Sequence, residues 1–401
     1  MTNLYQAHYQ WAHRPDDERF ETLQDMFQAC RSYAATAKTT TLPFDMLRVE
    51  ADEGELYLVG KTDRRAKFTH YAFGQLARGA QSPAEFVRQL PATLASQVIN
   101  NRLKAVSEGS PSKYDARILF HENGSLVTRA ITSELYDRTW NHEVIGTGIL
   151  PMLKDGWRVP PARPVRENQK GTRKATEADI LPNQGDFGLS VNVGDDIAPA
   201  GLYASDHDMF AFLVNPERSI DIGKRALMRG MFVRNSEVGD GSLVIDWFDL
   251  DNVCGNHIVW GAENRKQIRV RHVAGKNRRD QGDTLKRALA KFEVECRVYE
   301  NQAKNREEQI KKAQKFEIAA TKGDTIEAIF AFARKNGLTA LSRKTLEAGY
   351  AKAEEHEDWY GSPRTVFGLI SGLTEHSQSI PYTDERHTID VQAGRVMEIA
   401  F

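Results

Sequence analysis

Two short stretches of the sequence concentrate carboxylates at a spacing that could hold a divalent metal ion. The stretches are ASDHDMF and DWFDLD, and their acidic residues and histidine are Asp206, His207, Asp208, Asp246, Asp249 and Asp251. Hard cations prefer several carboxylate oxygens, so a metal-dependent enzyme acting on nucleic acid would take its ligands from Asp206, Asp208, Asp246 and Glu237. In a strand, however, Asp206 and Asp208 share one face and His207 points to the other. Because no Lys or Glu stands at the motif spacing of a nuclease, we predict strand-edge and turn acids and no bound metal.

Cysteine and histidine form one further candidate pair. Cys254 and His257 are three residues apart, but a zinc site needs two more ligands, and Cys30 and Cys296 have no partner at short spacing. Cys254 is therefore predicted to be a small core residue. Three dispersed cysteines also argue against a disulfide framework and favour a reducing compartment.

Motifs that mark common enzyme classes are absent from the sequence. It contains no GxxxxGK[ST], no GxGxxG after a strand, no GxSxG and no HExxH. This absence favours a protein that is not an enzyme and needs no cofactor.

Positive charge is concentrated locally although the whole chain is nearly neutral, with 54 Lys and Arg against 55 Asp and Glu. Between residues 263 and 287 the basic residues outnumber the acidic ones nine to three, and a second basic stretch lies in the Pro-rich segment at 157–186. Side chains that neutralise phosphates are the main source of affinity for nucleic acid. The predicted nucleic-acid-binding residues are Lys266, Arg269, Arg271, Lys276, Arg278 and Arg279, with Arg173 and Lys174 from the second stretch. The alternative is that both stretches are solvated surfaces.

The letters QIRVRH give the first of these stretches a defined geometry. Alternation places Arg269 and Arg271 on one face of a strand and Ile268 and Val270 on the other. We therefore expect a strand that buries its apolar face and presents two guanidinium groups, followed by a basic loop, GKNRR.

The elements that must position these residues indicate an α+β fold, with antiparallel β-meanders, packed helices and a helical C-terminal part. Composition and periodicity divide the chain into an N-terminal α+β region (1–156), a Pro-rich basic linker or loop (157–186), a β-meander core with the basic strand and loop (187–281) and a C-terminal helical region (282–401).

The stretch FVRNSEVGDGSLVIDWFDLDNVCGNHIVWG reads as a β-hairpin that leads into the basic segment. Gly239, Asp240 and Gly241 are expected to supply positive φ angles in its turn. Asn235 and Glu237 are expected to brace the turn through backbone hydrogen bonds, and Asn256 the exit after Cys254.

Four segments in order resemble the phage/plasmid-like protein family known as domain of unknown function 932. They are YAFGQLARGAQSPAEFVRQLPATLASQVINNRL, RAITSELYDRTWNHEVI, the hairpin just quoted and TVFGLISGLTEHSQ. The resemblance spans roughly 71–378, is most specific in the NSEVG, Gly-Ser and Cys-x-Asn series, and implies a phage, prophage or plasmid context.

Together these features predict a phage nucleic-acid-binding protein without enzymatic activity, most concretely one that binds and anneals single-stranded DNA in recombination. Such proteins typically form homo-oligomers that hold the strand by its phosphates in a positively charged groove. The alternatives are a structural or host-interaction protein and the metal-dependent enzyme. The sequence has neither a basic-then-apolar leader nor an apolar run of about 18 residues, so we expect a cytoplasmic protein of the bacterial host cell with no membrane partner.

Overall fold

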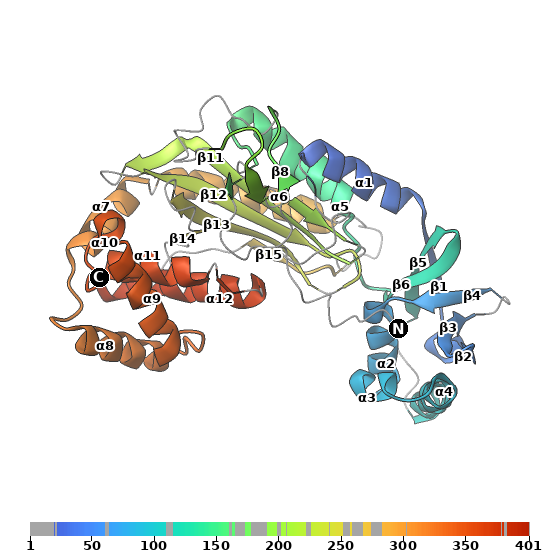
Figure 1. The fold of residues 1–401 in the computed structure, drawn as a ribbon. Helices are drawn as coiled ribbons and strands as arrows, with labels where there is room; N and C mark the ends of the chain where they lie inside the picture. Colours follow the sequence, from blue (N-terminus) through green and yellow to red (C-terminus); the bar gives the residue numbers. More distant parts are fainter. Residues whose placement is uncertain are drawn as a thin grey trace.

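The protein is described here by a computed structural model. It describes residues 20, 22–60, 64–109, 115–159, 163–164, 173–177, 191–198, 202–205, 207–221, 226–239, 241–251, 257–258, 268–273, 283–301, 303–377, 379–380 and 383–400. The predicted α+β fold is confirmed: antiparallel sheets and helices are mixed, and the C-terminal part is helical. A central sheet lies between an N-terminal α+β unit and a C-terminal helical unit (Figure 1).

The N-terminal unit is a six-stranded sheet covered by helices. Its strand order is β1-β5-β6-β4-β3-β2, and all neighbours are antiparallel except the parallel pair β4 and β6. Helices α2 and α4 contribute Leu76, Ile99 and Leu103 to a core that the sheet completes. The elements are β1 (Ala37–Leu42), β2 (Arg48–Asp52), β3 (Glu55–Val59), β4 (Arg65–Phe68), α2 (His70–Gly79), α3 (Ala84–Arg88), α4 (Ala92–Gly109), β5 (Ala116–Asn123) and β6 (Ser125–Ser133).

The central sheet is the predicted meander. Its strands follow the chain in the order β10-β11-β12-β13-β14, and β15 pairs with β13 beside β14. The strands are β10 (Leu202–Ala204), β11 (Met209–Asp221), β12 (Ala226–Asn235), β13 (Leu243–Asp251), β14 (His257–Ile258) and β15 (Ile268–Val270).

One face of the central sheet is apolar and packs against helices from distant parts of the chain. Alternate residues such as Ala211, Val233, Ile245 and Ile268 lie opposite one another across four strands and are buried. The helices on this face are α1 (Leu23–Ala35), the helical segment Asn141–Asp155 and α6 (Asp283–Asn301), as seen above the sheet in Figure 1.

The helical segment Asn141–Asp155 combines three kinds of turn. It contains the short α5 (Asn141–Glu143), a π-helix (Val144–Ile149) and a 3-10 helix (Leu150–Asp155), where the sequence predicted one helix. A Cβ at Gly146 would lie 2.8 Å from Cε2 of Phe27. The glycine therefore allows α1 to pack closely on this segment.

The described residues of the predicted linker include two short strands, which pair with a third strand from the predicted meander region. β7 (Arg163–Pro164) and β8 (Arg173–Lys174) both pair with β9 (Asp196–Ala198). Just before them, Trp157 is buried in the central core, where its ring centroid lies 5.8 Å from that of Trp247.

The C-terminal unit is a helical bundle with its own core. It consists of α7 (Ala303–Lys315), α8 (Lys322–Lys335), α9 (Arg343–Glu355), α10 (Glu357–Tyr360), α11 (Val366–Ser377), α12 (Thr383–Gly394) and a 3-10 helix (Arg395–Ala400). A Cβ at Gly372 of α11 would lie only 2.1 Å from the carbonyl oxygen of Gly349 in α9, so the two helices cross with backbone contact. In the part of the chain that the structure describes, no helix has the length and apolarity needed to span a membrane.

Candidate functional site

The two arginines that the sequence singled out lie on β15 (Arg269) and directly after it (Arg271). Ile268 and Val270 are buried in the central core, and Arg269 and Arg271 are exposed, as the alternation predicts. Nε of Arg269 donates to Oγ of Ser242 at 3.3 Å. Among the described residues, no carboxylate forms an ion pair with either arginine, so both guanidinium charges face solvent.

The first turns of α6 add two more cations next to this strand. α6 and β15 share one core, to which Ala288 contributes a buried methyl group. Lys286 and Arg287 are exposed, and Nη2 of Arg287 donates to the carbonyl oxygen of Val273 at 3.1 Å. We call Arg269, Arg271, Lys286 and Arg287 the basic surface; the last two were counted in the basic stretch but not chosen as binding residues from the sequence.

Asp137 fixes both ends of the segment that carries the predicted basic loop. Its Oδ2 accepts from Thr284 N at 3.0 Å and from Thr284 Oγ1 at 2.6 Å, both in buried positions. Its backbone N–H donates to the carbonyl oxygen of His272 at 3.2 Å. Asp137 therefore holds His272 and Thr284, which lie on either side of segment 274–282.

His272 is a neutral component of this anchor. It is 4% exposed, and its Nδ1 lies 3.2 Å from the carbonyl oxygen of Asp137. Burial lowers the pKa of the imidazole to about 4, with a smaller opposing contribution from Asp137. At neutral pH, His272 adds no charge to the basic surface.

Several predicted binding residues cannot be placed on this surface. Lys266, Lys276, Arg278 and Arg279 lie outside the described residues, as does the predicted turn residue Asn256. In the second basic stretch, Arg173 pairs with Ile197 of β9 through its backbone. Nζ of Lys174 forms an exposed ion pair with Oδ2 of Asp196 at 3.0 Å, which partly neutralises its charge.

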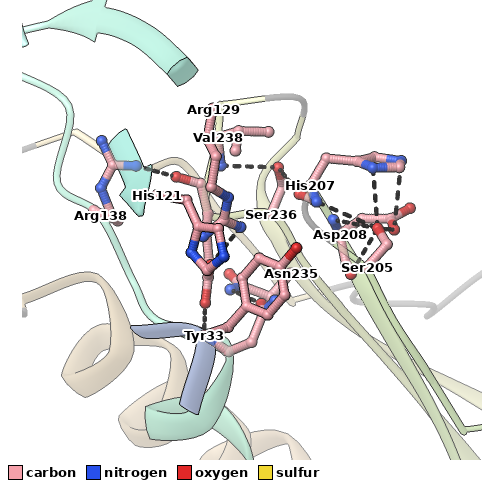
Figure 2. Close-up of polar contacts among 12 residues, drawn as sticks. Tyr33, His121, Arg129, Arg138, Ser205, His207, Asp208, Asn235, Ser236 and Val238 are labelled. Carbon is pink, nitrogen blue, oxygen red and sulfur yellow. Dashed lines mark hydrogen bonds and ion pairs between the residues drawn. The ribbon is translucent and has the colours of Figure 1, made fainter. Parts of the chain in front are cut away.

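The NSEV stretch, Asn235 to Val238, lies in a buried polar network between the N-terminal unit and the central sheet (Figure 2). Glu237 is 1% exposed; its Oε2 lies 2.9 Å from Nη2 of Arg129, and its Oε1 accepts from the backbone N–H of Asn141 at 2.8 Å. Nδ2 of Asn235 donates to the carbonyl oxygen of Thr139 at 2.9 Å. Asn235 and Glu237 thus join the turn to segment 129–141, whereas the sequence predicted that they would brace the turn itself.

Three successive carbonyl groups of this stretch accept hydrogen bonds from side chains of the preceding region. The Tyr136 hydroxyl donates to Ser236 at 2.9 Å, Nη1 of Arg138 to Glu237 at 2.5 Å, and Nε2 of Gln75 to Val238 at 2.6 Å. Figure 2 shows Arg129 and Arg138 directed toward this stretch. Because buried carbonyls need such partners, the turn depends on residues that lie 99 to 163 positions earlier in the chain.

The two glycines of this turn differ in conformation. Gly239 has a φ of 88°, in the left-handed region, as predicted. Gly241 does not have a φ in that region, so the prediction of a positive angle there was wrong. Only Gly239 is needed for its backbone freedom; Asp240 lies outside the described residues.

Aromatic groups enclose the buried Arg129. Its Cζ lies 4.8 Å from the ring centroid of Tyr33 in α1, and that ring stacks on His121 of β5 with a centroid distance of 4.4 Å. Close by, burial and, to a smaller extent, the charge of Glu237 raise the pKa of the Cys30 thiol to about 12. Cys30 is therefore an unreactive core thiol, since nucleophilic attack requires the thiolate.

Ser205, His207 and Asp208 lie together at the β10–β11 turn (Figure 2). Oγ of Ser205 donates to Oδ1 of Asp208 at 2.7 Å and lies 3.0 Å from Nδ1 of His207. Nε2 of His207 lies 3.6 Å from Oδ1 of Asp208. In a catalytic triad the serine hydroxyl bonds to the histidine alone, whereas here it donates directly to the carboxylate. The backbone N–H of Asp208 also bonds to Oγ of Ser205 at 3.2 Å, which is the pattern of a side-chain-stabilised turn.

The described members of the proposed metal-ligand set, Asp208, Glu237 and Asp246, are not gathered into one site. Glu237 is engaged by Arg129, and Asp208 by Ser205; Asp206 and Cys254 lie outside the described residues. Across the described ranges, no group of three or more His, Cys, Asp or Glu side chains is placed to hold a metal ion. Asp246 is buried and accepts from the backbone N–H of Trp247 at 3.0 Å.

Comparisons with known proteins identify no relative of this chain. No protein family, curated protein or solved structure matches the chain. The function proposed for the site therefore depends on the geometry of its residues.

Proposed function

We propose that the protein binds single-stranded nucleic acid, with DNA favoured, through the basic surface, and acts without catalysing a reaction. The observation that carries this proposal is the exposure of Arg269 on β15 and of Arg271 directly after it, with no ion pair to a carboxylate of the described chain. A guanidinium that is not neutralised by a carboxylate can bind a phosphate bidentately. The surface thus has the chemistry needed to hold a nucleic-acid backbone.

The sheet beneath Arg269 supports this proposal. Arg234 lies opposite Val244, and Val244 lies opposite Arg269, so the two arginines project from one face two strands apart. Cζ of Arg234 lies 5.3 Å from the ring centroid of Phe210, the next residue in the same row. Phe210 is 6% exposed, so it supplies no ring for stacking bases, and the contribution of this row is positive charge behind Arg269.

We extend this proposal to a phage or plasmid context, a role in strand annealing and assembly into a homo-oligomer. They follow from the resemblance to domain of unknown function 932 and from the β-meander with its basic strand. A bacterial cytoplasmic location belongs to the same proposal.

The direct test measures the affinity for single-stranded oligonucleotides as salt concentration rises, by fluorescence anisotropy. Each phosphate neutralised on a single strand contributes about −0.7 to the slope of log K against log salt. The variant Arg269→Ala/Arg271→Ala is therefore expected to weaken binding at low salt and to make the slope less steep by about 1.4.

A matched control removes the same charge elsewhere. Arg334 and Lys335 are exposed in the last turn of α8, in the C-terminal unit. Replacing both with alanine is expected to leave affinity and slope close to the wild type. An absence of binding at low salt, or an unchanged slope after the β15 substitutions, would contradict the proposal and favour a structural or host-interaction role. Comparison of DNA, RNA and duplex substrates defines the preferred nucleic acid.

The metal-dependent alternative is tested in the same samples. Magnesium-dependent cleavage of the oligonucleotide that is lost in Asp208→Ala would replace the binding proposal with an enzymatic one. We expect intact oligonucleotide with and without magnesium, because the Asp208 carboxylate already serves the β10–β11 turn.

A further inference from the structure

A pocket of about 430 Å³ lies where the N-terminal unit meets the 236–241 turn of the central sheet. Its lining includes Tyr71, Gly74 and Arg78 of α2, Arg88 of α3 and Gly239 of the turn. This volume is within the range of sites for small molecules.

Arg88 is held at the pocket in a fixed position. Its Nη2 donates to the carbonyl oxygen of His70 at 3.0 Å, and its Cζ lies 5.5 Å from the ring centroid of Phe73. A Cβ at Gly74 would lie 3.1 Å from the same Nη2. The glycine therefore leaves room for the guanidinium to lie against α2.

Arg78 provides a second positive charge on the same pocket. It is exposed at the C-terminal turn of α2 and forms no ion pair with any residue that the structure describes. Among the described residues that line the pocket there is no Asp or Glu. Glu85 is near enough to Arg88 to favour its charged form, but it is not part of the lining.

The wall formed by the turn is rigid. Nε2 of Gln75 donates to the carbonyl oxygen of Val238 at 2.6 Å, and Oε1 of the same residue accepts from the backbone N–H of Ile131 at 2.7 Å. This one side chain therefore ties α2, β6 and the turn together beside Gly239. A pocket with such a wall is formed before a ligand arrives, which lowers the cost of binding.

We propose that this pocket binds a phosphate monoester, with Arg78 and Arg88 as its anion-binding residues. Paired guanidinium groups match the oxygens of a phosphate and bind them through charge-assisted hydrogen bonds. Ser82 also lines the pocket and offers a hydroxyl group. The phosphate is carried by a free nucleotide or by the 5′ end of a strand. The proposal does not rest on the basic surface, because none of its residues belongs to that surface.

The test uses isothermal titration of the full chain with inorganic phosphate and with adenosine monophosphate. It also compares a 5′-phosphorylated oligonucleotide with its 5′-hydroxyl form in the Arg269→Ala/Arg271→Ala background. Arg78→Gln is the first variant, since Arg78 has no ion pair whose loss would disturb folding. Arg88→Met and Gly74→Ala follow, and Arg334→Gln is the matched control.

Binding of phosphate or the mononucleotide that weakens about tenfold or more in Arg78→Gln, but not in Arg334→Gln, supports the proposal. Stronger binding of the 5′-phosphorylated strand that depends on Arg78 also supports it and identifies the strand end as the ligand. Equal affinities for Arg78→Gln and wild type, or no binding of any phosphorylated probe at millimolar concentration, would overturn it. Neither result would bear on the salt slope measured for the basic surface.

Discussion

Arg129 and Glu237 form an ion pair that is almost completely shielded from water. Their side chains are 1% and 2% exposed, and Nη2 lies 2.9 Å from Oε2. The pair joins β6 of the N-terminal unit to the end of the central hairpin. Removing either partner would leave an uncompensated charge in a buried site. We therefore expect both residues to be needed for the contact between the two units.

The first prediction concerns this pair. Glu237→Gln is expected to lower the free energy of unfolding by about 3–5 kcal/mol, because Arg129 keeps its charge in a buried site. Replacing both residues, as Arg129→Met/Glu237→Leu, should recover part of this loss. Urea denaturation followed by circular dichroism measures the effect.

An exposed ion pair provides the control for that experiment. Nζ of Lys322 lies 2.7 Å from Oε2 of Glu354, and both side chains are nearly half exposed. Glu354→Gln is expected to cost less than about 1 kcal/mol. Equal losses in Glu237→Gln and Glu354→Gln would show that burial of the Arg129 pair does not matter.

A second prediction compares the two glycines of the central turn. Gly239→Ala is expected to destabilise the protein by about 1–3 kcal/mol, because φ there is 88° and the added Cβ would lie 3.3 Å from atoms of Gln75 and Thr132. Gly241→Ala is the matched control: the added Cβ would lie 3.8 Å from its nearest neighbour, Nη2 of Arg234, so we expect a change within about 0.5 kcal/mol. Thermal unfolding of the two variants checks the order.

A third prediction follows from His272. Its pKa is about 4 in the folded chain and 6.5 ordinarily, so between these values the unfolded chain binds a proton that the folded chain does not. Stability is therefore expected to fall as pH decreases from about 6.5 to 4, by up to about 3 kcal/mol from this residue. His272→Asn keeps a donor near Asp137 and cannot become charged.

The measurement for His272 is the urea midpoint at a series of pH values. The wild type should lose more stability than His272→Asn over this window. Parallel curves for the two proteins would show that the imidazole does not contribute to acid sensitivity.

A fourth prediction separates anchoring from charge at the basic surface. Asp137→Ala removes a negative charge, so a purely electrostatic account predicts tighter binding of single-stranded DNA. We expect weaker binding, because Thr284 loses the carboxylate that holds the start of α6, whereas the backbone bonds between residue 137 and His272 remain. Anisotropy titration of the folded variant decides between these outcomes, and tighter binding would show that the anchor has no role.

Local patterns in the sequence were sufficient to predict much of the fold. The three- and four-residue spacing of Leu23, Met26 and Cys30 is typical of an amphipathic helix and agrees with α1, and Asn123 with Gly124 is typical of a hairpin turn and agrees with β5 and β6. Alternation along QIRVRH predicted which side chains of β15 are exposed. In each case neighbouring residues determine the outcome, so the period is visible without the tertiary structure.

The buried network was not predictable in the same way. Arg129, Arg138 and Gln75 meet the NSEV stretch only because β6, α2 and the central turn come together in the fold, about a hundred residues or more apart in sequence. The one local signal was an arginine within the apolar run of β6. Helix α12 was also missed, since its place in the bundle depends on the tertiary packing of Ile389 and Ala393 and on the Ser377–Asp390 hydrogen bond.

The position of α1 has a consequence for synthesis of the chain. The helix ends at Ala35, but its apolar residues pack with strands that begin at Leu202, whose carbonyl accepts from the backbone N–H of Phe20 at 3.1 Å. At ribosomal rates of about 5–20 residues per second, the intervening chain takes on the order of ten seconds to make. For that time the apolar stripe of α1 lacks its partners in the central sheet, although segment Asn141–Asp155 is already made. The nascent chain therefore presents an early binding segment for chaperones, and completion of the central core is a late folding event.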